Sequence, residues 1–191
     1  IEAYDMFSSL NRHRDEYVAF GGHRMACGIT IQEEKIKELR ALWNKEAAFS
    51  DADCEPSVEV DAKLPFSGLH GDVMQQISSL EPFGKGNPSP IFAALGVNVL
   101  HLRLVGKQHN VLQARLESQG VTMQAVAFSG EALLEKLKNT CPSDKKADLS
   151  AALRGQDAGL RVDVLYRPEW NEYNGQKSIQ LKLADMRFSA L

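Results

Sequence analysis

The segment VTMQAVAFSGEALLEKLKNT, residues 121–140, changes its hydrophobic period from two to about 3.6 near its middle. Apolar and polar residues alternate in the first half, which is typical of a strand with one buried face. In the second half Leu133, Leu134 and Leu137 recur at helical spacing. The segment therefore predicts a strand that is followed directly by a short helix.

Four other alternating segments flank this one, two before it and two after it. They are NVLHLRLVG (98–106), NVLQARLE (110–117), LRVDVLYRP (160–168) and KSIQLKLADMRF (177–188). Turn-forming residues separate neighbouring segments, and Asn174-Gly175 is the strongest turn signal because both central positions of a type I′ turn need positive φ. Five strands with a helix between the third and fourth give the chain order of an OB-fold, a barrel often used to bind single strands. We therefore predict an OB-fold domain over residues 91–191.

The residues before the barrel divide into two regions. Residues 1–55 contain helical patterns and one strand, MACGITI. A lone strand leaves two unpaired edges, so we expect this region to be the C-terminal part of an α/β domain. Residues 56–90 are expected to be a linker with a short strand at 57–64 and a helix that stops at Pro82. Within the barrel, the polar stretch 140–159 is expected to be a long and partly mobile connection.

Composition and charge exclude several classes of protein. Hydrophobic residues make up 43% of the 191 residues and charged residues 25%, which is ordinary for a globular protein. No apolar run approaches the ~18 residues that span a bilayer. The formal net charge is −3, so contact with nucleic acid would need a local basic face. The chain begins at Ile1 without a signal-peptide pattern, and we interpret it as a piece of a longer protein.

The three cysteines, Cys27, Cys54 and Cys141, argue against two kinds of site. They are odd in number, widely spaced and without a C-x-x-C pair, which disfavours a disulfide framework and a zinc site. This usage favours a reducing compartment and hence a cytoplasmic location. Asp and His residues also show no clustering of the kind that a two-metal site needs.

The barrel strands carry a candidate basic face for single-stranded DNA. Cations gather around its first and last hairpins, and neighbouring aromatic rings could each stack a base at ~1–3 kcal/mol. A solvated basic surface beside core aromatics explains the same pattern equally well. The candidate residues for binding single-stranded DNA are Arg103, Lys107, His109, Arg115, Phe128, Tyr166, Tyr173 and Lys177.

The stretch FGGHRMACG, residues 20–28, is a second candidate site. Gly21-Gly22 before His23 can form a turn with exposed N–H groups, which suits phosphate oxygens. Spacing alone favours the plainer alternative, a glycine turn that carries a surface histidine. EPFGKGNP, residues 81–88, is a weak phosphate-loop candidate that is better explained as a rigid elbow between domains.

The order of FGGHRMACGITI, LEPFGKGNPSPIF, RLVGKQHNVLQARL and YRPEWNEYNGQKSIQLKLADM resembles the carboxy-terminal part of the RecJ family. This family comprises bacterial single-strand-specific 5′ to 3′ exonucleases of the DHH phosphoesterase superfamily. The resemblance covers nearly all of the chain. Gly-Gly-His with Ala-Cys-Gly occurs across the superfamily, whereas LEPFG-x-GNP followed by a barrel is far more specific to RecJ. Two departures are Cys27, where alanine is more usual, and an insertion over residues 145–158.

The resemblance implies the end of a DHH-associated α/β domain followed by a five-stranded OB-fold barrel. Gly21, Gly22 and His23 would help to hold the 5′ phosphate, and the barrel would clamp the entering strand. The longer protein to which this chain would belong is expected to hydrolyse phosphodiesters with Mn²⁺ or Mg²⁺ in DNA repair and recombination. Its expected partners are single-stranded DNA and, as candidates, single-strand-binding protein or other repair factors, with no membrane.

Because the Asp-His-His motif is missing, we expect no catalytic residue, metal or cofactor in this chain and no cleavage by the chain alone. Two alternatives stay open. One is a binding-only adaptor for nucleic acid or protein, and the other is a related phosphodiesterase that acts on short oligonucleotides.

Overall fold

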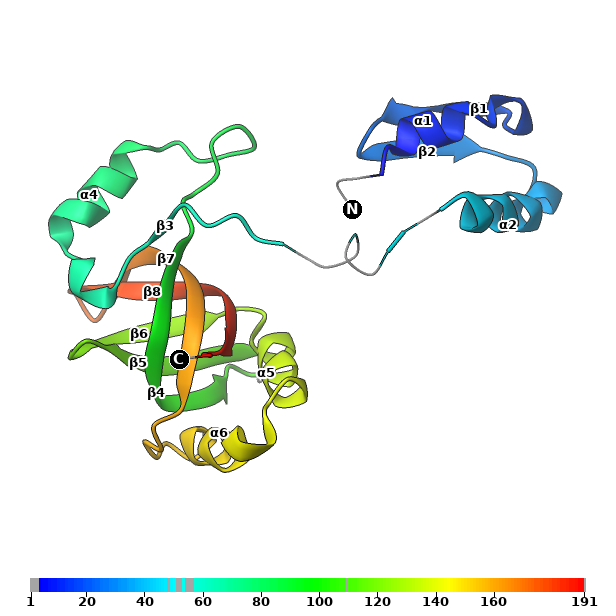
Figure 1. Cartoon of the computed structure of the whole chain (residues 1–191). Helices are drawn as coiled ribbons and strands as arrows, with labels where there is room; N and C mark the ends of the chain where they lie inside the picture. Colours follow the sequence, from blue (N-terminus) through cyan, green and yellow to red (C-terminus); the bar gives the residue numbers. More distant parts are fainter. Residues whose placement is uncertain (1–3, 48, 51–52, 54–56, 109, 191) are drawn as a thin grey trace. The chain divides into compact units, whose positions relative to one another are not determined.

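The computed structural model describes residues 4–47, 49–50, 53, 57–108 and 110–190. The chain divides into two compact units, Ile1–Val58 and Glu59–Leu191 (Figure 1). Cys54 and His109 lie outside the described residues. No helix in the described ranges is both long and apolar enough to cross a membrane.

The first unit is a two-stranded hairpin with helices before and after it. Its elements are α1 (Met6–Asn11), β1 (Ala19–His23), β2 (Ala26–Thr30) and α2 (Ile36–Glu46). Leu10, Tyr17 and Leu39 form its small buried core. We predicted a single strand here, which is wrong, because Ala19–His23 is also a strand and the turn lies at Arg24 and Met25. Two adjacent glycines, which are uncommon in strands, hid β1 in the sequence.

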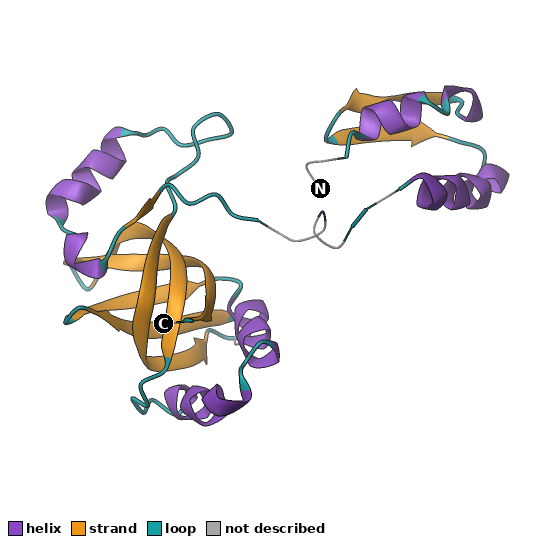
Figure 2. Cartoon of the chain, in the orientation of Figure 1, coloured by secondary structure: helices purple, strands orange, loops and turns teal. Residues whose placement is uncertain are grey.

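The second unit is built around a closed five-stranded barrel, which confirms the predicted OB-fold (Figure 2). Its strands are β4 (Phe92–Val105), β5 (Val111–Ser118), β6 (Val121–Ala127), β7 (Arg161–Tyr173) and β8 (Gln176–Phe188). Neighbours follow the order β4-β5-β6-β8-β7, and a further pairing of β4 with β7 closes the barrel. The β6–β8 pair is parallel and the other barrel pairs are antiparallel.

Alternation along these strands builds the core. Val97, Val99, Leu102, Leu112 and Leu116 are fully buried, as is Ala114, and the residues that alternate with them face outward. The pairing of β4 with β7 shifts register between Ala94 and Val97, around Gly96, whose φ is 62°. The Gly96 N–H donates to Asp163 on β7 at 3.0 Å. Such a bulge bends a strand, which lets β4 pair with two neighbours in turn.

Two helices connect β6 to β7. The predicted first helix is α5 (Gly130–Asn139), with Leu133, Leu134 and Leu137 buried. The long polar connection predicted after it is wrong, because a 3₁₀ turn at Ser143–Lys145 leads into α6 (Lys146–Leu153). Leu149 and Ala152 bury one side of α6. So short a helix with two buried residues leaves no clear hydrophobic period in the sequence.

The segment before the barrel packs within the same unit. β3 (Ala62–Lys63) pairs in parallel with the start of β4, so the strand predicted at 57–64 shortens to two residues. The helix predicted before Pro82 is α4 (Gly71–Ser79). Asn87 closes the loop that follows, since its side-chain amide donates to the carbonyl oxygens of Leu80 (2.7 Å) and Pro82 (3.1 Å).

Candidate nucleic-acid interface

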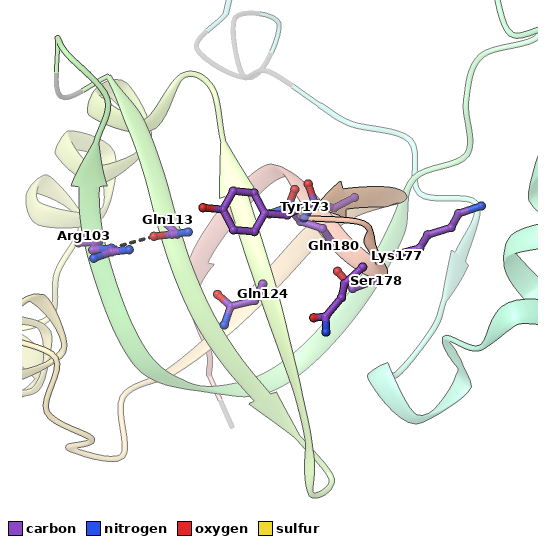
Figure 3. Close-up of a pocket in the computed structure, with 9 residues that line it drawn as sticks. Arg103, Gln113, Gln124, Tyr173, Lys177, Ser178 and Gln180 are labelled. Atoms are coloured by element: carbon purple, nitrogen blue, oxygen red, sulfur yellow. Dashed lines mark hydrogen bonds between the residues drawn. The ribbon is translucent and has the colours of Figure 1, made fainter.

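A cavity of about 850 Å³ opens between the outer face of β4, β5 and β6 and the hairpin of β7 and β8 (Figure 3). Five of its side chains are amides, and we call it the amide groove. It is lined by Arg103, Gln113, Gln124, Asn171, Tyr173, Gln176, Lys177, Ser178 and Gln180.

Strand alternation places the floor of the amide groove. Leu102 and Leu112 face the core, so Arg103 and Gln113, which pair across β4 and β5, face outward. Gln124 on β6 pairs in the same way with Gln180 on β8. The Arg103 Nε donates to the Gln113 Oε1 at 2.7 Å, shown as a dashed line in Figure 3. This bond uses one of the five guanidinium N–H donors, so it orients the group and leaves donors for a ligand.

The β7–β8 hairpin forms the wall of the amide groove. Asn174 (φ 51°) and Gly175 (φ 75°) make its turn, as the sequence predicted. Tyr173, which is 73% exposed, extends its ring from the hairpin toward the side of Gln113 and Gln124 (Figure 3). The Lys177 side chain points away from those amides, and its Nζ lies 4.4 Å from the centroid of the Trp170 ring.

Three of the eight predicted binding residues, Arg103, Tyr173 and Lys177, meet in the amide groove. Arg115 is exposed on β5 and pairs with Gln124, which places it beside the groove. Lys107 is exposed in the turn between β4 and β5. Phe128 is 61% exposed just after β6, with the Lys182 Nζ 5.3 Å from its ring centroid.

Tyr166 needs a correction as a predicted base-stacking platform. It is fully buried in the barrel core, where no base can reach its ring. Its hydroxyl donates to the Leu64 carbonyl oxygen at 2.6 Å, and burial raises the pKa of this phenol well above its usual value. Tyr166 shares the inward phase of Val162 and Val164 on β7, so the alternation in the sequence already contained this information.

Gly21, Gly22 and His23 lie in β1 of the first unit. Gly22 has a φ of +145°, and a Cβ there would lie 2.6 Å from the Cα of Cys27, its partner on β2. The hairpin itself therefore requires this glycine. Gly21 faces open space instead, and the exposed His23 ring accepts a hydrogen bond at its Nδ1 from the Met25 N–H at 3.3 Å.

The described residues do not form a recognisable metal site. Within them, no three His, Cys, Asp or Glu side chains are grouped so that they could hold a metal ion. Cys27 and Cys141 are free thiols.

Most of the groove-lining residues were not predicted from the sequence. The predicted binding residues are cations and aromatic residues, whereas the floor of the groove consists mainly of amides such as Gln113, Gln124 and Gln180. The alternation of each strand could have identified them, because each occupies an outward position on a barrel strand.

Comparison with known proteins identifies relatives over most of the chain. The family model described as the RecJ OB domain matches residues 60–185. The single-stranded-DNA-specific exonuclease RecJ of Bacillus subtilis is 25% identical over 191 residues, covering 99% of this chain and 22% of that protein. The protein with the same description from Thermus thermophilus is 34% identical over 180 residues, covering 94% of this chain and 22% of that protein.

The chain spans between 22% and 30% of the length of the curated relatives that it matches. Among solved structures, RecJ from Thermus thermophilus in complex with Mn²⁺ aligns with a TM-score of 0.69 and 24% identity. That alignment covers 100% of this chain and 25% of the solved one. It shows that the two share a fold.

Proposed function

This chain belongs to the RecJ OB domain family, and we propose that its barrel binds single-stranded DNA for a RecJ-like 5′ to 3′ exonuclease. The observation that carries this proposal is the position of the amide groove. OB-folds bind oligonucleotides on their second and third strands beside the loop that joins the fourth and fifth. The corresponding parts of this barrel are β5, β6 and the β7–β8 turn, and all three border the groove.

The chemistry of the amide groove suits a single strand. Its lining includes two cations, Arg103 and Lys177, and no carboxylate, so its local charge is positive although the chain carries −3. Cations attract the phosphate backbone, and Tyr173 offers an exposed ring for stacking. The side-chain amides can both donate to and accept from base edges, which any base can match in some orientation. This combination favours binding with little sequence preference.

In this proposal, hydrolysis takes place in a part of the full-length exonuclease that lies outside this chain. The Mn²⁺ or Mg²⁺ expected for the family would supply an activated water and charge stabilisation there. The described residues here do not fit a metal site, so we assign them only binding and orientation. A role in DNA repair and recombination belongs to the same proposal and rests on the sequence resemblance.

The proposal is tested by fluorescence anisotropy with a labelled 12-nucleotide strand and its duplex form. We expect the 191-residue chain to bind the single strand more tightly than the duplex. Arg103→Ala and Tyr173→Ala should each weaken that binding several-fold, because they remove a phosphate contact and a stacking surface. Lys138→Ala, which removes an exposed cation from α5, is the matched control. Equal affinity for single strand and duplex, or groove variants that match the control, would reject the proposal.

We further propose that Gly21 and His23 contact the 5′ phosphate of the strand. The open space at Gly21 and the exposed imidazole of His23 support this. We do not assign a phosphate contact to Gly22, because the geometry of the hairpin already explains why this residue is glycine. The test compares strands that carry a 5′ phosphate or a 5′ hydroxyl. The phosphate should increase affinity for the wild-type chain and not for His23→Ala, and identical binding of the two strands would argue against the assignment.

A further inference from the structure

A second cavity, of about 310 Å³, lies between α4, the loop after it and strands β7 and β8. We call it the loop–barrel cavity. Met74 and Ile77 of α4 and Phe83 of the loop line one side, and Trp170 and Lys182 of the barrel line the other. Phe83 belongs to the EPFGKGNP segment, for which the amide groove gives no role.

Strand β8 contributes side chains to both the amide groove and the loop–barrel cavity. Ser178 and Gln180 line the amide groove, and Lys182, the next outward residue on β8, lines the second cavity. The Lys177–Trp170 pair joins the two cavities as well, because Lys177 lines the groove while the ring beneath its ammonium lines the cavity. A DNA strand that leaves the amide groove along β8 would therefore reach this cavity next.

The walls of the cavity suit a flat apolar group. Trp170 is 41% exposed, so part of its ring is open to a ligand beside its contact with the Lys177 ammonium. Met74 is almost fully buried and gives the cavity an apolar base beside Ile77 and Phe83. Tryptophan is well suited to stacking a nucleobase, whose ring is also flat and polarisable.

The charges of the cavity favour a base over a phosphate. Glu81 and Glu169 line it together with Arg167 and Lys182, so these charges balance and the cavity, unlike the amide groove, offers a phosphate group no net positive charge. The Arg167 Nε is already engaged, since it donates to the Ser89 carbonyl oxygen at 3.3 Å. Carboxylates accept hydrogen bonds from the amino groups of cytosine and adenine, and thymine has no such group.

The loop is held in a shape that keeps the cavity open. Besides the two bonds from the Asn87 side chain, Gly84 and Asn87 exchange backbone hydrogen bonds of 2.8 and 3.1 Å. Phe83 stands between these anchored residues. The EPFGKGNP segment therefore forms a preorganised wall, which lowers the cost of ordering a ligand beside it.

We propose that the loop–barrel cavity is a second subsite for single-stranded DNA, in which a base that carries an amino group stacks on Trp170. This inference rests on the proposed function. It adds a defined position beyond the amide groove and assigns a binding role to the EPFGKGNP loop. It also adds a preference for cytosine over thymine to the amide groove, for which we expect little sequence preference.

Intrinsic fluorescence tests the stacking, because the chain contains two tryptophans, Trp43 and Trp170. The probes are twelve-nucleotide strands of cytosine (dC12) and thymine (dT12). Binding of dC12 should quench the wild-type emission. Trp170→Phe, in which Trp43 is the remaining tryptophan, should bind with similar affinity and lose the quenching. A quench that persists in Trp170→Phe would overturn the proposal.

Affinity measurements separate this subsite from the amide groove. Trp170→Ala should weaken dC12 binding roughly five- to a hundredfold, the equivalent of one lost stack, and Trp170→Phe should restore most of it. Glu169→Ala should bring the dC12 and dT12 affinities together, whereas Glu172→Ala, an exposed carboxylate on the same hairpin outside the cavity, should leave their ratio unchanged.

Two further outcomes would also be decisive. If Arg103→Ala weakens binding while Trp170→Ala does not, the second subsite is wrong and the amide groove stands. If the wild-type chain binds neither strand, both proposals fail. Far-UV circular dichroism of each variant confirms that its fold is retained.

Discussion

The hydroxyl of Tyr166 donates a 2.6 Å hydrogen bond to the carbonyl oxygen of Leu64, 102 residues earlier in the chain. The Tyr166 ring also meets Phe66 edge-on, with 6.0 Å between the ring centroids. Leu64 and Phe66 precede α4, whereas Tyr166 lies in the middle of β7. These contacts fix the start of the segment that carries α4 and the EPFGKGNP loop to the core of the barrel.

Replacing Tyr166 with Phe should destabilise the second unit by about 1–3 kcal/mol, because the Leu64 carbonyl oxygen would lose its partner while the ring still filled its space. Chemical unfolding of the 191-residue chain, followed by circular dichroism, measures this change. An unfolding free energy equal to that of the wild type would mean that water or another donor replaces the hydroxyl.

The same residue predicts a loss of stability in alkali. Burial raises the pKa of Tyr166 in the folded chain, whereas the phenol of the unfolded chain ionises near pH ~10. The folded state therefore holds its proton more tightly, and this contribution to stability is present below pH ~10 and lost as the pH rises further. The free energy of unfolding should fall more steeply above that pH in the wild type than in Tyr166→Phe. Parallel curves would contradict the assignment.

Gly130, at the start of α5, should tolerate no side chain. A Cβ there would lie 2.6 Å from the carbonyl carbon of Val111 and 2.7 Å from the Leu112 Cβ on β5. Gly130→Ala should destabilise the barrel by ~1–3 kcal/mol through overpacking. Gly71→Ala is the matched control, because a Cβ at the first residue of α4 meets open space. Equal unfolding midpoints for the two variants would show that α5 can shift away from β5.

The barrel could be predicted from the sequence because each of its strands buries one face. That burial forces alternation, and hairpin signals such as Asn174-Gly175 mark where the strands reverse. β1 and α6 were missed for the opposite reason. In β1 the adjacent Gly21 and Gly22 contribute no side chains to a pattern, and in α6 only Leu149 and Ala152 are buried.

The candidate site was less accessible from sequence. Arg103, Tyr173 and Lys177 could be selected by chemistry, but their proximity depends on the curvature that brings the β7–β8 hairpin beside β4, β5 and β6. The proposed role of Trp170 depends on a loop about 85 residues before it, and no local pattern in the sequence shows that the two line the same cavity. Residues so far apart in the sequence can be assigned to one groove or cavity only from the three-dimensional structure.

The two glycines of β1 should respond differently to the same change. Gly22→Ala should open the hairpin, since a Cβ would collide with the backbone of Cys27 and the φ of +145° disfavours alanine. Gly21→Ala meets open space and should leave the hairpin intact. Hydrogen exchange measured by mass spectrometry over residues 19–30 distinguishes them, with faster exchange in Gly22→Ala alone. Equal protection in both variants would remove the structural explanation for Gly22.

The Arg103–Gln113 hydrogen bond predicts that the charge of Arg103 and the orientation of its guanidinium contribute separately to the binding of single-stranded DNA. Arg103→Ala removes a cation, so the slope of log K against log salt should become shallower by ~0.7 if this residue neutralises one phosphate. Gln113→Leu keeps the charge and removes the acceptor that holds the Arg103 Nε at 2.7 Å. It should weaken binding of the single strand and leave the salt slope unchanged, because the guanidinium still reaches the phosphate but loses its fixed direction.

Anisotropy titrations across a salt series measure both quantities, and Lys138→Ala on α5 should alter neither the slope nor the affinity measured in the same series. An unchanged slope for Arg103→Ala would show that Arg103 does not contact the phosphate backbone from the floor of the amide groove. A shallower slope for Gln113→Leu would show that the contact with phosphate depends on the Gln113 hydrogen bond, so that charge and orientation do not separate.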